Sequence, residues 1–381
     1  MAAYDYNTLK NKYNDFINPV AEIKANKKDF SKNKGGYIVS DIIVELTCGY
    51  EASIASFCVY NSFDRENGKF LWEGLKDYFS LGSPVTVTAG YGSQLNDIFT
   101  GFVSKVNFVY GNEEIPHVEI LCMDIKGVMM AGSHENQMTS NNFGDSIGEI
   151  FRKSVYEKMK SSGVYTQLSI TATPDRNNSE GNKESDRTIE VMGESDYEFT
   201  VRAARRFNYE FFTDCGRVLF RKARTPEVTL MSLNTTMGLS KLSVEYDIIG
   251  QVENVQVRGT DYGTSELITA KRKLNSTISG SNKAKQIISG SEKIYVDSSV
   301  KSEKDAGYRL ESAIERITYG FGNMHCRCVG LPELKPGNFI EIEGMGSPPS
   351  NKFYLVEVKH CIDDEEGYVT ELTGRTDKIK Q

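Results

Sequence analysis

Residues 194–212 read ESDYEFTVRAARRFNYEFF, and this stretch carries the strongest local signals in the chain. Ser195 is followed three residues later by Glu198, which is a capping box: each side chain satisfies a free backbone N–H of the first helical turn. The stretch predicts a helix that ends near Asn208 and leads through YEFF, the turn DCGR and VLFRK into a β-hairpin. One helical face is expected to hold Tyr197, Val201 and Ala204, with Arg202, Arg205 and Arg206 mostly off it.

The aromatic and arginine side chains of this stretch allow two interpretations. They could form a binding surface, or they could form a structural joint between a helix and a hairpin. The capping chemistry favours the joint, because it explains the polar residues at the start of the helix without any ligand.

The composition of the whole chain predicts a protein rich in β-strands. The 381 residues are 39% hydrophobic and 25% charged, and they include 20 Tyr and 19 Phe with many β-branched residues. A chain of this length is sufficient for two or three domains.

The first part of the chain predicts a small β-barrel or sandwich over residues 35–128. Five strand-like runs follow one another at short spacing, with WEGLKDYF as a short helix between the second and the third. The polar residues 1–34 precede them and are expected to form a solvated arm that carries a cluster of lysines. These are Lys24, Lys27, Lys28, Lys32 and Lys34.

A central α/β region is expected over residues 129–237. Apolar residues recur there at helical spacing before Gly163, and a strand and a polar loop over 175–187 precede the capping box. The expected helix face consists of Ile147, Ile150, Phe151, Val155 and Met159.

A second β-barrel is expected over residues 238–378. It contains a Gly/Ser-rich loop at about 274–293, in which ISGS occurs twice, and a helix over 302–319 that Ser302 and Asp305 begin. The apolar face of that helix is Ala306, Leu310, Ala313, Ile314 and Ile317.

A weak internal repeat connects the two expected barrels. LGSPVTVTAGYG followed by DIFTGFVSKVNFVYG matches in pattern LKPGNFIEIEGMG followed by NKFYLVEVKHCID. Both pairs have a Gly/Pro turn, a short alternating strand, a Gly-rich loop and a longer strand. The predicted fold class is therefore α+β and mainly β, with two similar small β-barrels flanking a central α/β region.

Charge and cysteine content narrow the functional classes. The net charge of −7 argues against nonspecific nucleic-acid binding, which needs an excess of Lys and Arg. Seven cysteines spread over the chain suggest reduced thiols in a reducing cytoplasm rather than a disulfide framework. We expect no signal peptide and no stable membrane span, since no apolar run is long enough.

Catalytic and metal motifs are scarce in the sequence. It contains no G-x-S-x-G elbow, no phosphate-binding P-loop and no EF-hand loop, and HENQM at 134–138 lacks the second His of a zinc motif. We therefore predict no catalytic residue, no metal and no cofactor. HCRC and HC could meet if their strands pair, which makes His325, Cys328, His360 and Cys361 the candidate metal ligands.

Two segments resemble the phage late control gene D and VgrG hub proteins. The first is 194–212, with its Ser-Asp-Tyr-Glu-Phe helix start, Arg/Ala-rich helix and aromatic strand. The second lies in the C-terminal third, where a helix, a Gly/Pro-containing strand and a strand ending in His follow in the order of that family. The residues on the family pattern are Ser195, Asp196, Tyr197, Glu198, Phe199, Gly330, Pro332, Pro336, Gly337, Tyr354, Val356 and His360.

The resemblance implies a structural role in a contractile tail. Hubs of this family are trimers whose two similar β-barrels per subunit form a ring of six, which matches a sixfold tail tube to a threefold spike. VgrG proteins continue into a β-helical spike, and this sequence ends soon after the hub segment. It is therefore similar to the hub-only type of phages and phage-tail-like bacteriocins, with tail tube, separate spike and other baseplate proteins as expected partners.

Two other functions are alternatives to the hub. A tail-tip cell-wall hydrolase would need a catalytic constellation, which the sequence does not display. A secretion-system spike or effector carrier is closely related to the hub, and its usual C-terminal extension is not present in this sequence.

Overall fold

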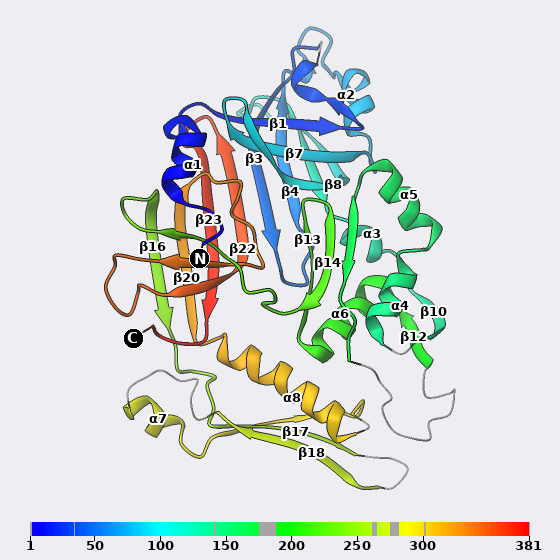
Figure 1. Cartoon of the computed structure of the whole chain (residues 1–381). Helices are drawn as coiled ribbons and strands as arrows, with labels where there is room; N and C mark the ends of the chain where they lie inside the picture. The colour runs from blue at the N-terminus through cyan, green and yellow to red at the C-terminus, as the bar shows by residue number, and fades with distance from the viewer. Residues whose placement is uncertain are drawn as a thin grey trace.

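The computed structural model confirms a mainly β, α+β fold built around one sheet of 13 strands (Figure 1). The structure describes residues 2–33, 35–140, 142–174, 188–260, 265–274, 282–300 and 302–380. Within these residues no helix is long and apolar enough to cross a membrane.

The first half of the large sheet is a six-strand unit. From one side of the sheet to the other, its strands are β3 (Ile38–Thr47), β4 (Ile54–Tyr60), β9 (His117–Met123), β8 (Gln94–Val109), β7 (Pro84–Tyr91) and β1 (Pro19–Ala25). All neighbouring pairs in this unit are antiparallel.

The second half repeats the same neighbour order. Its strands are β16 (Leu239–Tyr246), β20 (Gly322–Val329), β23 (Gly367–Thr376), β22 (Lys352–Asp363), β21 (Phe339–Ile342) and β15 (Thr229–Leu233). β15 pairs with β21 in parallel, which is the one departure from the antiparallel pattern of the first unit.

The two units match down to their register. In the first, β8 and β9 pair from Phe102 onward with a bulge between Val103 and Lys105. In the second, β22 and β23 pair from Tyr354 onward with a bulge between Leu355 and Glu357. Since a bulge is a local feature that strands do not share by chance, the repeat seen in the sequence corresponds to two copies of one β-unit.

The two units are joined edge to edge. Residues Glu357–Ile362 of β22 pair with residues Ile42–Thr47 of β3, so the sheet is continuous across the junction. Side chains from both units, among them Val44, Phe57, Met324 and Leu372, belong to the same apolar core.

Residues 1–34 are not a solvated arm. β1 pairs with β7 along its whole length, and Tyr13 and Phe30 are fully buried in the main core. The prediction was wrong because it gave the lysines more weight than the apolar residues between them. The lysines do remain exposed, namely Lys24, Lys27, Lys28 and Lys32; position 34 lies outside the described residues.

The central region contains two short helices where one was predicted. α4 (Phe143–Ile150) and α5 (Ser154–Ser162) are separated at Lys153, whose ψ of 143° is incompatible with a helix. This turn lets Phe151 pack against the rings of Tyr156 and Tyr165, and it leaves Val155 42% exposed. Gly163 ends α5 in the left-handed conformation, as expected.

The remaining central elements surround the hairpin that residues 194–212 begin. β10 (His134–Thr139) pairs with β12 (Thr188–Glu194), and HENQM therefore lies in a strand. The helix α6 (Asp196–Phe207) leads into the predicted hairpin of β13 (Tyr209–Asp214) and β14 (Arg217–Lys222). β11 (Gln167–Ile170) adds to it in parallel, and the loop expected over 175–187 lies outside the described residues.

A third layer lies below the large sheet in Figure 1. α8 (Glu303–Thr318) packs on the sheet of β18 (Leu267–Lys273), β17 (Asn254–Thr260) and β19 (Glu292–Val296). The five predicted apolar residues of α8 are buried, and Ser302 caps it through the N–H of Asp305.

The Gly/Ser-rich stretch at 274–293 is in part a helix. α7 (Asn282–Ile288) forms there because NKAKQII contains good helix formers. Ile288, at the end of this helix, is buried in a cluster with Phe321. Its first ISGS, at 278–281, lies outside the described residues. The smaller elements are α1 (Tyr6–Lys12), η1 (Asn14–Phe16), β2 (Lys28–Asp29), η2 (Phe30–Lys32), β5 (Phe63–Asp64), β6 (Lys69–Phe70), α2 (Trp72–Phe79) and α3 (Lys126–Met129).

Candidate assembly site

The capping box at the start of α6 is present as predicted. The backbone N–H of Glu198 donates to Ser195 Oγ at 3.1 Å, and the N–H of Ser195 donates to Glu198 Oε2 at 2.8 Å. The cap fixes the direction in which β12 enters the helix.

Asp196 connects three elements of the central region. Its carboxylate is 8% exposed and accepts hydrogen bonds from Lys153 Nζ and from the Tyr156 hydroxyl, both at 2.7 Å. His134 Nε2 of β10 lies 3.2 Å from the same carboxylate. The pKa of Tyr156 is raised mainly by burial, and the hydrogen bond to Asp196 raises it further. Asp196 is thus a polar anchor for α5 and β10.

Tyr197 and Phe199 extend the joint in two directions. The Tyr197 hydroxyl donates to the carbonyl of Tyr50 at 2.9 Å, which attaches α6 to the loop between β3 and β4. Phe199 is fully buried, with its ring centroid 5.9 Å from that of Phe143.

The arginines of α6 have partners within the chain. Arg206 forms an ion pair with Asp305 at 2.9 Å, which joins α6 to α8. Arg202 pairs with Glu194, and the Arg205 guanidinium lies 5.0 Å from the centre of the Tyr50 ring. Of the three, Arg202 and Arg205 are exposed.

The two segments on which the resemblance to hub proteins was based meet at Glu210. This side chain is 7% exposed, accepts a hydrogen bond from Arg221 Nε at 3.2 Å, and accepts a second from the hydroxyl of Tyr354. Burial raises the pKa of Glu210 although the tyrosine and the arginine counteract it. Sequence reasoning named Tyr354 but missed Glu210 and Arg221, because neither stands out in YEFF or VLFRK.

Gly337 is required by this contact. Its φ is +79°, and a Cβ atom there would lie 2.6 Å from Phe212 Cζ and 2.7 Å from Arg221 Nη2. Arg221 Nη2 also donates to the Gly337 carbonyl. The loop can therefore approach the hairpin only with a glycine at this position.

Gly330 and His360 belong to a second buried group, at the junction of β7 with the second β-unit. A Cβ on Gly330 would lie 2.1 Å from the Tyr368 ring, and the hydroxyl of Tyr91 donates to the Gly330 carbonyl at 2.9 Å. The Tyr368 hydroxyl lies 3.0 Å from Nδ1 of His360. Burial lowers the pKa of His360 to about 3, so the ring is neutral at physiological pH.

Pro332 and Pro336 are buried in the loop that connects β20 to β21. Between them, the buried Glu333 accepts hydrogen bonds from the Tyr13 hydroxyl at 2.6 Å and from Lys12 Nζ at 2.9 Å. The signature loop is thus attached to the N-terminal segment.

The four candidate metal ligands do not converge. β23 separates β20 from β22, His325 is exposed on one face of β20, and Cys328 is buried on the other. His360 shares the buried face with Cys328, whereas Cys361 points the opposite way along β22. Within the part of the chain that the structure describes, no group of three or more His, Cys, Asp or Glu side chains is placed to hold a metal ion.

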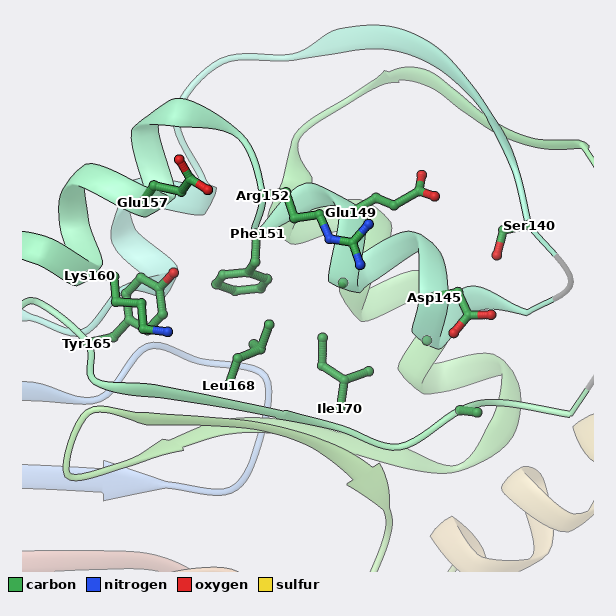
Figure 2. Close-up of a pocket in the computed structure, with 13 residues that line it drawn as sticks. Ser140, Asp145, Glu149, Phe151, Arg152, Glu157, Lys160, Tyr165, Leu168 and Ile170 are labelled. Carbon is green, nitrogen blue, oxygen red and sulfur yellow. The ribbon is translucent and has the colours of Figure 1, made fainter.

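A surface pocket of about 860 Å³ lies between α4, α5 and β11 (Figure 2). Leu168 and Ile170 of β11 line one side with Phe151, and charged side chains of both signs line the helical side. Ser140 Oγ donates to the carbonyl of Asn142 at 2.8 Å. Sequence reasoning missed the pocket because it exists only where the expected single helix is broken. The charged lining residues are Asp145, Glu149, Arg152, Glu157 and Lys160.

Comparison with known proteins assigns the chain to a family. The profile described as the Alg8 N-terminal domain matches residues 64–364, which is most of the chain. The chain belongs to this family. A search of curated proteins found no match.

Solved structures of tail proteins share the fold. A tail protein from Neisseria meningitidis MC58 superposes with a TM-score of 0.67 at 9% identity, over 94% of this chain and 97% of that chain. The 43 kDa tail protein of prophage MuSo2 from Shewanella oneidensis gives a TM-score of 0.66 at 12% identity, over 93% and 98%.

A secretion protein shares the fold as well. It is an E. coli component of the type VI secretion system, described as similar to the T4 bacteriophage tail proteins gp27 and gp5. Its TM-score is 0.53 at 9% identity, and the match covers 89% of this chain and 73% of that chain. The fold is therefore one that phage tails and type VI secretion share.

Proposed function

We propose that this protein is a structural baseplate hub of a contractile tail or injection system, of the late control gene D and VgrG-like type. In this role it would form a homotrimer that joins a sixfold tail tube to a threefold central spike. The fold likeness to tail proteins supports this proposal, and so do the two signature segments that meet at Glu210.

The observation that carries the proposal is the duplicated β-unit. One chain holds two units with the same neighbour order and the same bulge. Three chains would therefore present six similar surfaces to a sixfold partner and three identical ones to a threefold partner.

Each part of the chain has a place in this proposal. The two β-units would supply the two β-barrels of the ring. The range 35–128 expected from the sequence leaves out β1 of the first unit, and the range 238–378 leaves out β15 of the second and includes the separate layer of α8. The rest of the central region, 129–237, would lie nearer the spike. The partners would be the tail tube protein, a separate spike protein and other baseplate components, in a particle assembled in the bacterial cytoplasm.

The proposed role is structural rather than catalytic, because the signature residues serve packing. Ser195 caps a helix, Asp196 and Tyr354 anchor buried polar groups, and Gly337 permits a close approach. A hub of a secretion system is the related candidate, supported by the likeness to the type VI component.

Light scattering on the purified protein, followed by negative-stain imaging, tests this proposal. We expect trimers that appear as threefold rings. A stable dimer, or particles without a threefold ring, would contradict the hub. A peptidoglycan clearing assay on the same sample separates it from a hydrolase, since a hub is expected to leave the cell wall intact.

A further inference from the structure

β16 alternates apolar and polar residues from Leu242 to Tyr246 and lies at the end of the sheet. It pairs with β20 and with no other described strand, and Figure 1 shows it at the left border. Its counterpart in the first unit is β3, which is covered on its other edge by β22. Val44 of β3 is fully buried, whereas Val244 at the matching position of β16 is only partly buried.

The second half of β8 also has a free edge. Residues Lys105–Val109 pair with β9 on one side, while β7 reaches only as far as Phe102 on the other side. Phe108 contacts the rings of Phe70 and Trp72, and Tyr110 contacts that of Phe63, yet Phe108 remains 43% exposed and Tyr110 64% exposed. The matching position to Phe108 in the second unit is His360 of β22, which is fully buried, with β3 beside its strand and the Tyr368 ring packed against it.

The chain therefore contains one completed junction and the two halves of another. In the completed junction, β3 of the first unit pairs with β22 of the second. The uncompleted halves are β16, which matches β3, and β8, which matches β22. An exposed edge with unpaired backbone groups is a surface on which another strand can add.

We propose that β16 of one copy pairs antiparallel with Lys105–Tyr110 of β8 in the next copy, in the register that β3 and β22 use within the chain. This inference rests on the proposed function, because it supplies the contact that would close a ring of hubs. The expected partners are Lys105 with Asp247, Val106 with Tyr246, Asn107 with Glu245, Phe108 with Val244, Val109 with Ser243, and Tyr110 with Leu242.

The chemistry of the two edges supports this register. On the core side it places Phe108 and Tyr110 over Val244 and Leu242, so that exposed aromatic surface is buried against apolar partners. On the other side it brings Lys105 opposite Asp247. The completed junction has an ion pair on the same face, between Lys359 and Glu45 at 3.0 Å.

The contact is head-to-tail, since two different edges meet. A heterologous interface of this kind forms a closed ring when the rotation between copies closes. Each copy then contributes one junction within the chain and one to its neighbour, so the sheet would continue around the ring.

Paired cysteines test the register on the full chain. In the double variant Val109→Cys with Ser243→Cys, the two residues are expected to be direct partners on the solvent side. Antiparallel partners have Cα atoms roughly 4.5–5.5 Å apart, which suits a disulfide. The positive control is Ile43→Cys, because residue 43 pairs with the native Cys361 in the completed junction.

Two further variants control for register and for the native cysteines. Val109→Cys with Glu245→Cys is offset by two residues and therefore separates the thiols by roughly 7–8 Å. Each single variant reports any linkage through the seven native cysteines. All are oxidised at high protein concentration and run on non-reducing gels, and light scattering gives the assembly state.

We expect the Val109→Cys with Ser243→Cys variant to lose its monomer band in favour of a ladder of linked copies, while the offset pair and the single variants stay monomeric on the gel. Threefold rings in which this pair remains unlinked would overturn the interface and leave the hub function standing. Unlinked monomers would overturn the interface too, whereas the hub function is contradicted only by a stable dimer or by particles without a threefold ring.

Discussion

Gly82 and Gly337 occupy the same place in the two β-units, and their surroundings differ. Gly82 has a φ of +84° and donates its N–H to the carbonyl of Val103; Gly337 has a φ of +79° and donates to Leu355. A Cβ at Gly82 would meet no atom within 4 Å, whereas one at Gly337 would meet Phe212 and Arg221. The duplicated backbone is thus the same, and the second unit has become the attachment point for the α6 hairpin.

The largest difference between the units is expected in how their contribution to folding stability depends on pH, and His360 is its source. The first unit has Phe108 at the matching position, which cannot be protonated. The pKa of His360 lies near 3 in the folded chain and near 6.5 when unfolded. Because the folded pKa is depressed, the stability that the neutral ring contributes is complete above about pH 6.5 and is lost as pH falls toward 3.

The free energy of unfolding is expected to fall by about 4 kcal/mol between these two pH values, since a shift of one pKa unit corresponds to about 1.4 kcal/mol. His360→Phe places the first unit's residue in the second and removes this proton. Urea denaturation of both proteins across the pH range gives the difference. The variant is expected to be less stable at neutral pH, by about 1–3 kcal/mol, because the Tyr368 hydroxyl loses its acceptor. Parallel pH curves for the two proteins would contradict the assignment.

Substitution of the two glycines measures the attachment of the hairpin directly. Gly82→Ala should lower the free energy of unfolding by about 1–2 kcal/mol, because an alanine is strained at a positive φ. Gly337→Ala should cost about 3 kcal/mol or more, since the added methyl also collides with Phe212. Equal losses in the free energy of unfolding would show that the hairpin contact does not distinguish the two units.

The sequence predicted features that depend on neighbouring residues and missed those that depend on distant contacts. The Ser195 cap, the end of α6 at Asn208 and the apolar face of α8 follow from neighbours within a few residues. The repeat was visible because turns and alternation recur in order. Glu210 and Arg221 were missed because their role depends on Tyr354, more than 100 residues away.

The same limit explains the errors. Helical spacing continues from Ile150 to Met159 through the turn at Lys153, so periodicity alone could not reveal the break that forms the pocket. In residues 19–25 the apolar side chains alternate with Glu22 and Lys24, and that short alternation carried less weight than the lysines until β7 provided a partner. No metal was predicted, and the four residues were candidates only if β20 and β22 paired; the intervening strand β23 could not be inferred from the residues of these two strands.

Two valines at matching positions compare a covered edge with a free one. Val44→Ala removes two buried methyl groups and should cost about 2–3 kcal/mol in the free energy of unfolding. Val244→Ala in dilute monomer should cost about 1 kcal/mol, because the edge is partly exposed already. If copies pair through β16, the cost of Val244→Ala should rise in the assembled ring. An equally large loss for both valines in the monomer would mean that β16 is already covered.

The smallest effect is expected for the ion pair of the completed junction. Lys359 and Glu45 lie 3.0 Å apart, with side chains 37% and 47% exposed, so water and salt screen their attraction. A double-mutant cycle with Lys359→Ala and Glu45→Ala should give a coupling of about 0.5 kcal/mol, falling further at high salt. The backbone pairing and the buried apolar row of β3 and β22 would then hold the units together, with the charges serving mainly to select the register. A coupling well above 1 kcal/mol would contradict this, and it would make Lys105 and Asp247 a major source of affinity between copies rather than a guide to their alignment.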